Sequence, residues 1–184
     1  MHKNILVIGG TGMLSDASYE LAQQSDVFTS VARTKESLNR FNQRLVNVNT
    51  EHHTLSLNWD DKESFISTLR QHINVIGVPD MVVTWLHRSA FIGELSRLFV
   101  QTEREVIIYQ VLGSSVTNPG KANDIADTVA DGINYHQIVL GFTVESGQSR
   151  WLRNEEISAG VIAAIKRNQQ TYIVGQLEPW SLRP

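Results

Sequence analysis

The residues best suited to chemistry form a glycine-rich turn near the start of the chain, from Gly9 to Ser15. The apolar run Lys3–Ile8 before the turn predicts a buried central strand, and the segment Met13–Gln24 after it has apolar residues at helical spacing. A turn between a buried strand and a helix presents main-chain N–H groups at the positive end of the helix dipole. Such groups bind anions, so the arrangement predicts a phosphate site.

The glycines of the turn have separate expected roles. Gly9 permits the sharp exit from the strand, and Gly12 lets the main chain approach a phosphate because it carries no Cβ. The turn therefore predicts a dinucleotide site, and the cofactor-binding residues expected in it are Gly9, Thr11, Gly12, Met13 and Leu14. Glycine-rich turns also end ordinary strands, so a scaffold without a ligand is the alternative.

The residues after the second predicted strand bear on the choice between NADP and NAD. NAD sites usually place an Asp or Glu about 20 residues after the turn, where it accepts hydrogen bonds from ribose hydroxyls. This chain has Arg33 and Thr34 there, followed by Lys35. A guanidinium cannot accept those bonds but pairs with a 2′-phosphate. We therefore expect NADP ahead of NAD as the cofactor; the alternative is that Arg33 is an ordinary solvated side chain.

These features resemble the short-chain dehydrogenase/reductase superfamily, particularly its atypical and extended members, whose first turn reads Gly-x-x-Gly-x-x-Gly. Ser15 occupies the third glycine position, which serves close packing of the helix on the strand. The resemblance implies a nicotinamide dinucleotide cofactor. It also implies cofactor contacts from segments after the third and fourth strands, namely Asn58, Trp59, Thr84 and Trp85. The second of these segments departs from the family's usual Asn-Asn-Ala-Gly, and the alternative for Trp85 is an ordinary tryptophan of the core.

The catalytic residues of that superfamily are missing from the sequence. Hydride-transferring members carry a Tyr-x-x-x-Lys pair, in which the lysine lowers the tyrosine pKa and holds the nicotinamide ribose. Each tyrosine of this chain is followed four positions later by another residue type, in turn Gln23, Gly113, Val139 and Gln176. Standard Ser-Tyr-Lys catalysis is therefore not expected, although Ser114 and Ser115 follow the fifth strand. The remaining acid–base candidates, chosen by their position alone, are His87, Tyr135 and His136. The alternative for each of them is a purely structural role.

Composition narrows the remaining possibilities. The chain has no cysteine, so disulfides and cysteine chemistry are excluded. Its net charge of −3 comes from interspersed acidic and basic residues, and this charge pattern argues against a nucleic-acid partner. The pair His52-His53 has no carboxylate partner at metal-ligand spacing, so no metal site is expected. No apolar run approaches the roughly 18–20 residues of a bilayer crossing, and the N-terminus lacks a signal-peptide pattern. We expect a cytoplasmic protein without a membrane partner.

Strand and helix patterns alternate along the chain. The expected strands are 3–8, 27–32, 53–57, 81–86, 106–112, 136–142 and 171–174, and the expected helices are 13–24, 35–45, 61–73, 90–100 and 154–166, with Asp61 and Asn154 as N-caps. The segment 113–132 is expected to be a loop with at most a short helix. Repeated βα units predict one Rossmann-type α/β domain over residues 1–184, with a doubly wound, mostly parallel sheet of about seven strands and helices on both faces.

Two further segments are expected to lie outside this core. Residues 146–153 are polar and are a hypothetical lid over the cofactor, and residues 175–184 form a C-terminal arm that either packs on its own domain or reaches a neighbouring subunit of a homo-oligomer. The sequence predicts an NAD(P)(H)-binding protein, either an oxidoreductase with a non-standard site for a small-molecule substrate or a non-catalytic nucleotide-responsive sensor. An interaction protein on a degenerate Rossmann scaffold is a further alternative.

Overall fold

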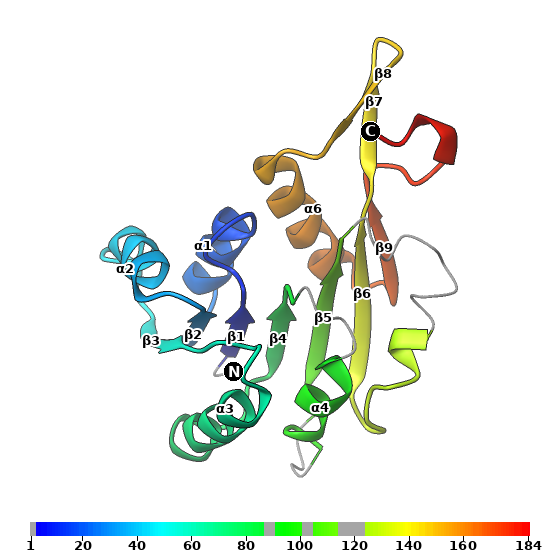
Figure 1. Cartoon of the computed structure of the whole chain (residues 1–184). Helices are drawn as coiled ribbons and strands as arrows, with labels where there is room; N and C mark the ends of the chain where they lie inside the picture. The colour runs from blue at the N-terminus through cyan, green and yellow to red at the C-terminus, as the bar shows by residue number, and fades with distance from the viewer. Residues whose placement is uncertain (1–2, 87–90, 101–104, 114–123) are drawn as a thin grey trace.

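A computed structural model of the protein describes residues 3–86, 91–100, 105–113 and 124–184. Its centre is a parallel sheet in the order β3-β2-β1-β4-β5-β6-β9 (Figure 1). The seven strands are β1 (Asn4–Ile8), β2 (Val27–Ala32), β3 (Glu51–Ser56), β4 (Met81–Thr84), β5 (Ile107–Leu112), β6 (Asn134–Leu140) and β9 (Thr171–Val174). The predicted doubly wound α/β fold is confirmed.

Helices cover both faces of the sheet (Figure 1). One face carries α1 (Ser15–Gln23), α2 (Lys35–Arg44) and α6 (Asn154–Arg167), and the other carries α3 (Lys62–Ile76) and α4 (Ile92–Arg97). Asp61 caps α3 as predicted, because its carboxylate accepts a hydrogen bond from the Ser64 N–H at 3.2 Å.

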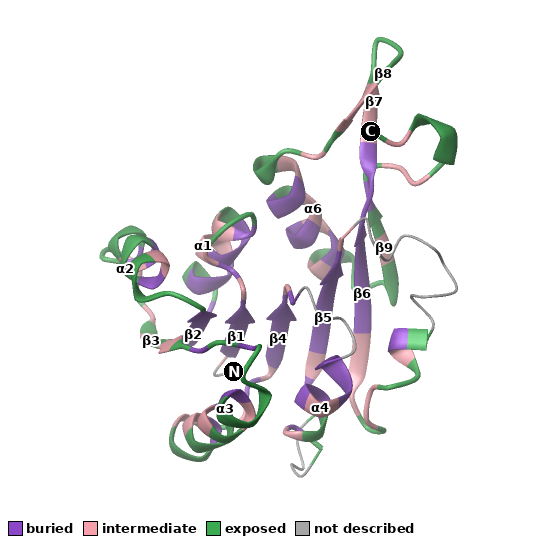
Figure 2. Cartoon of the chain, in the orientation of Figure 1, coloured by how far each residue is buried: buried purple, intermediate pink, exposed green. Residues whose placement is uncertain are grey.

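The two apolar cores alternate along each central strand. In β1, Ile5 and Val7 belong to the core under α1 and α6, whereas Leu6 and Ile8 belong to the core under α3 and α4. All of these side chains are buried, and the central strands are coloured as buried in Figure 2. This two-sided burial explains why β1 is a continuous apolar run and not an alternating one.

Several boundaries differ from the sequence expectation. Helix α1 begins at Ser15 and not at Met13, because the main chain up to Leu14 still belongs to the glycine turn, where the Ser15 N–H donates to the Gly12 carbonyl at 2.9 Å. Strand β3 begins at Glu51 and not at residue 53, so His52 lies within the strand together with His53. Pairing with β2 explains the earlier start, since His52 lies opposite Phe28 in register.

Residues 146–151 of the segment expected as a polar lid lie in a β-hairpin. Strands β7 (Phe142–Glu145) and β8 (Gln148–Trp151) pair antiparallel and project beyond the sheet (Figure 1). Ser146 and Gly147 make the turn with φ of 51° and 79°. Positive φ at both central residues is the geometry that matches the twist of a two-residue hairpin.

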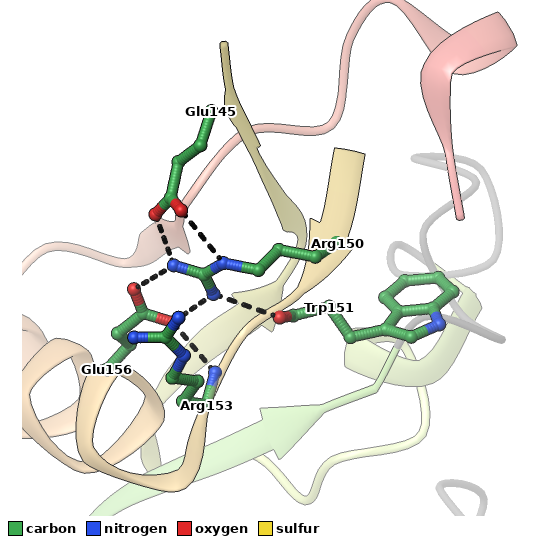
Figure 3. A network of polar contacts seen from close by, with 5 residues as sticks. All are labelled: Glu145, Arg150, Trp151, Arg153 and Glu156. Atoms are coloured by element: carbon green, nitrogen blue, oxygen red, sulfur yellow. Dashed lines mark hydrogen bonds and ion pairs between the residues drawn. The ribbon is translucent and has the colours of Figure 1, made fainter. Parts of the chain in front are cut away.

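Arg150 joins this hairpin to the start of α6 (Figure 3). Its guanidinium donates to the carboxylates of Glu145 and Glu156, with bonds of 2.8 and 2.9 Å to Glu156. The Glu156 carboxylate also accepts a hydrogen bond from the Arg153 N–H at 2.7 Å. The cap residue of α6 is therefore Arg153, and Asn154, expected as the cap, is the first residue of the helix.

The C-terminal arm packs on the same hairpin. Its short 3₁₀ helix η3 (Trp180–Leu182) is followed by Arg183, whose guanidinium carbon lies 5.3 Å from the ring centroid of Trp151 and 4.7 Å from that of Trp180. The arm thus contacts its own chain, the first of the two expected arrangements.

Candidate functional site

A cleft of about 470 Å³ lies at the carboxyl edge of the sheet, above the ends of β1 and β2. The described residues that line it are Gly9, Thr11, Gly12, Met13, Ala32, Arg33, Thr34, Ser37, Trp59 and Trp85. Eight of the eleven cofactor-binding residues expected from the sequence are among them. In doubly wound sheets, ligands bind at this edge, near the strand where the order of the sheet reverses.

The main-chain conformation of the glycine turn requires a glycine at its first position. Gly9 has a φ of 77°, and a Cβ built on it would lie 2.4 Å from the Trp85 carbonyl oxygen, so only glycine fits there. The Gly9 N–H donates to the Val31 carbonyl at 2.9 Å. The amide of Gly9 is therefore used within the fold and does not belong to the anion site.

The main-chain N–H groups of the five residues after Gly9 are not used in this way by the fold. Among the residues that the structure describes, the N–H groups of residues 10 to 14 donate to no acceptor. A Cβ built on Gly12 would meet no atom within 4 Å, so the main chain there is open to a ligand. Unpaired amides at the start of a helix form the partial positive charge that binds phosphate.

Gly10 has a different role from its neighbours. A Cβ built on it would lie 2.3 Å from the Ser18 Oγ and 2.4 Å from a Val7 methyl carbon. The Ser18 hydroxyl donates to the Gly10 carbonyl at 2.8 Å. Gly10 thus permits α1 to pack closely on β1, the role that the family pattern assigns to position 15. Ser15 instead accepts a hydrogen bond from the Arg44 guanidinium at 2.6 Å.

One end of the cleft is formed by Arg33 and Trp59. The exposed Arg33 guanidinium carbon lies 5.0 Å from the centroid of the Trp59 ring, and that ring is buried against the core. Beside them, Thr34 caps α2, its hydroxyl accepting from the Ser37 N–H at 3.3 Å. Ser37 was not predicted as a site residue, although the Thr-x-x-Ser spacing at a helix start could have indicated it.

The other end of the cleft is formed by Trp85, which follows β4. Its N–H donates to the Ile8 carbonyl at 2.8 Å, so its main chain continues the pairing with β1. The half-buried indole packs against the core under α1 and α6.

Three expected site residues do not line the cleft. The side chain of Leu14 is buried in the core, so that only its main chain can face a ligand. Asn58 is exposed, and its side-chain oxygen accepts from the Asp60 N–H at 3.1 Å. Thr84 is fully buried, and its hydroxyl makes no hydrogen bond within the described structure.

The acid–base candidates on β6 lie at the wrong edge of the sheet. Tyr135 and His136 are near the amino end of β6, opposite the cleft, because β6 begins at Asn134. Burial raises the pKa of Tyr135 to about 12, and its hydroxyl donates to the Gln110 side chain at 2.5 Å. Both His136 ring nitrogens are hydrogen-bonded, to Asn134 and to the Gln169 carbonyl. His87, Ser114 and Ser115 lie outside the described residues.

The histidines on β3 have structural partners. His53 is 2.8 Å from the Glu51 carboxylate, a partner that was not expected because Glu51 lies before the expected strand 53–57. Burial lowers the pKa of His52 and of His72, the second of which lies 5.5 Å from His53 between ring centroids. No group of three potential metal ligands occurs within the described part of the chain.

Comparison with solved structures gives the protein its place among known folds. LigD of Sphingobium sp. strain SYK-6 superimposes with a TM-score of 0.63 at 12% identity, covering 94% of this chain and 89% of that chain. A candidate D-mannonate oxidoreductase of Haemophilus influenza, with bound NAD, gives 0.66 at 12%, with 94% and 93% covered. An NAD⁺-bound xylitol dehydrogenase gives 0.58 at 13%, with 89% and 76% covered.

The likeness is one of fold. The chain has a Rossmann-type architecture in common with these three proteins, at an identity of 12–13%. No protein-family model matches the sequence, and no curated protein matches it either. Among the described helices, none has both the length and the apolar character needed to cross a bilayer.

Proposed function

We propose that this protein binds a nicotinamide dinucleotide in the cleft at the glycine turn, with NADP(H) preferred over NAD(H). The observation that supports this most strongly is the run of amides from residue 10 to residue 14, which have no acceptor among the described residues. Residues 11 to 13 of this run line the cleft. Gly10, Thr11 and Leu14 are buried or half-buried, and N–H groups of such residues are nearly always paired in proteins, so the lack of an acceptor for these three indicates a ligand. A pyrophosphate supplies the acceptors that they lack.

The preference for NADP follows from the end of the cleft formed by Arg33. The guanidinium is exposed on the Trp59 ring at the start of α2, where the helix dipole also favours an anion. Among the described lining residues there is no Asp or Glu that could accept hydrogen bonds from the ribose hydroxyls of NAD. A 2′-phosphate would pair with the Arg33 guanidinium, next to Thr34 and Ser37.

What the protein does with the dinucleotide has two candidate answers. The fold shared with NAD-bound dehydrogenases supports an oxidoreductase with a non-standard site. A specific observation favours the second candidate, a nucleotide-responsive protein without turnover. The described lining residues include no His, Tyr, Asp, Glu, Lys or Cys, so none of them can transfer a proton near neutral pH. An oxidoreductase consumes NADPH with some carbonyl substrate, whereas a nucleotide-responsive protein binds it unchanged.

Calorimetric titration with NADPH and NADH tests the proposal. We expect the wild type to bind NADPH more tightly, and Arg33→Asp to weaken NADPH binding by at least about tenfold, since a hydrogen bond to a charged group contributes about 1.5–3 kcal/mol. NADH binding should change far less. The matched control is Arg40→Asp, an equal change of charge on an exposed residue of α2 that does not line the cleft.

Two results would contradict the proposal at different levels. If neither nucleotide binds to the wild type, the cleft is not a dinucleotide site. If both bind and Arg33→Asp leaves their ratio unchanged, the site stands but the preference for NADP has another origin.

A further inference from the structure

Two tryptophans stand at opposite ends of the cleft. Trp59 follows β3 and Trp85 follows β4, and in the order β3-β2-β1-β4 the ends of β2 and β1 lie between them. The glycine turn after β1 occupies the middle of the cleft. A dinucleotide whose phosphates bind the turn, and whose adenosine end lies at Arg33, directs its second ring toward Trp85.

The indole of Trp85 is fixed in place. Its main chain pairs with Ile8, and its carbonyl packs against Gly9, where a Cβ would approach it to 2.4 Å. The ring rests on the core under α1 and α6, and a Cβ built on Gly113 would lie 3.6 Å from its Cη2 atom. The indole therefore extends from the end of β4 toward the end of β5, and Trp85 is one of the residues that line the cleft.

We propose that Trp85 is the stacking surface for the nicotinamide ring and makes the site select the oxidised cofactor over the reduced one. The inference rests on the proposed function and names what that site distinguishes. The oxidised nicotinamide is a pyridinium with a positive charge, whereas the reduced ring is neutral. Indole has the most electron-rich face among the protein side chains, and it attracts cations within about 6 Å of its centroid.

This selectivity would explain how a nucleotide-responsive protein without turnover distinguishes the two redox states of the cofactor. Stacking on Trp85 lets the cleft report the redox state of the cofactor pool, because the adenosine and phosphate contacts are the same in both forms. A cation–π contribution of about 0.5–2 kcal/mol corresponds to a preference of about two- to thirtyfold. The preference lies in Trp85 and not in the glycine turn or Arg33.

The test uses three ligands, NADP⁺, NADPH and adenosine 2′,5′-bisphosphate, the last of which lacks the nicotinamide. Wild-type protein should bind NADP⁺ more tightly than NADPH, within the range above, and show a long-wavelength charge-transfer absorbance with NADP⁺ only. Trp85→Leu should abolish this ratio and the absorbance while binding adenosine 2′,5′-bisphosphate as the wild type does. Trp180→Leu, which removes an exposed tryptophan of the C-terminal arm, is the matched control and should change none of these values.

The outcomes separate the inference from the proposed function. If adenosine 2′,5′-bisphosphate and both dinucleotides fail to bind to the wild type, the proposed function falls and this inference falls with it. If they bind, but the wild type shows no charge-transfer absorbance or no preference for NADP⁺, only the role of Trp85 is overturned. Should Trp85→Leu lose its fold, Trp85→Phe decides, because the smaller ring keeps the packing but must weaken the absorbance and reduce the ratio.

Discussion

At the scale of single residues, neighbouring glycines of the first turn have distinct physical roles. Gly9 adopts a positive φ against the Trp85 carbonyl, Gly10 leaves room for Ser18 and Val7, and Gly12 faces open space. The first two positions are therefore set by the fold itself. Only the third is left to a ligand, so substitutions at Gly10 and Gly12 should separate folding from binding.

Gly10→Ala should lower the free energy of unfolding by about 1–3 kcal/mol, because the new methyl group overpacks the contact between α1 and β1. Gly12→Ala should leave stability unchanged or slightly raised, since its Cβ meets nothing and the unfolded chain loses freedom. Denaturant unfolding measures both effects.

In the same pair of variants, Gly12→Ala should weaken NADPH binding by about tenfold, because its methyl group stands between the main chain and the phosphates. Gly10→Ala, where it remains folded, should bind normally. A Gly12→Ala protein with wild-type affinity would mean that the phosphates do not approach this part of the turn.

At the scale of elements, α6 connects the projecting hairpin to the glycine turn. Arg150 of β8 holds Glu156 in the first turn of α6, and two residues later the Ser158 hydroxyl donates to the Met13 carbonyl at 3.0 Å. The hydrogen bonds from Arg150, and then that from the Arg153 N–H, lower the pKa of Glu156 to about 2. The same carboxylate thereby caps the helix and anchors the hairpin.

Arg150→Met should raise the pKa of Glu156 toward its ordinary value of 4.5. Because the folded-state pKa lies below that of the unfolded chain, Glu156 stabilises the fold above about pH 4.5, and this contribution is lost as the pH falls toward 2. The variant should therefore lose less stability than the wild type on acidification through that range. Carboxyl-carbon NMR titration of Glu156 measures the shift directly.

The control for this variant is Lys166→Met, at the far end of the same helix, where the lysine pairs with Glu20 at 2.9 Å. It removes one positive charge from the protein, as Arg150→Met does, but the lysine does not contact Glu156. A Glu156 that still titrates near 2 in Arg150→Met would show that the helix start, and not the hairpin, sets its pKa.

The elements also mark where sequence reasoning succeeded and failed. Strand β1 was predicted because a strand buried on both faces is a continuous apolar run, whichever elements cover it. The N-cap at Asp61 was predicted because it depends only on residues close in the sequence. Apart from the buried Phe142, the strands of the hairpin β7–β8 are half-buried or exposed, so no clear apolar alternation predicted them. The local indication of the hairpin was its Ser146-Gly147 turn. Tyr135 and His136 stand at the amino end of both the expected strand 136–142 and the observed β6, whereas ligands bind at the carboxyl ends, so their choice as candidates was wrong whatever the exact boundary.

At the scale of the whole molecule, the cleft exists because the sheet reverses its order at β1. The chain runs from β1 to β2 and β3 on one side and then returns to β4 on the other, so the turn after β1 faces the space between the two halves. Four strand ends thus bring together residues from 9 to 85. The glycine turn and Arg33 were predictable from local spacing, whereas Ser37 and the position of Trp85 relative to Gly113 depend on how the elements pack.

The most direct test of the central claim is a ¹H–¹⁵N NMR titration of the protein with NADPH. The amides of residues 10 to 14 should show the largest shift changes and move downfield as they begin to donate to phosphate oxygens. The Gly9 amide, already bonded to Val31, should move much less. Binding that leaves residues 10 to 14 unperturbed while shifting amides elsewhere would contradict the account, because the ligand would then occupy a different site.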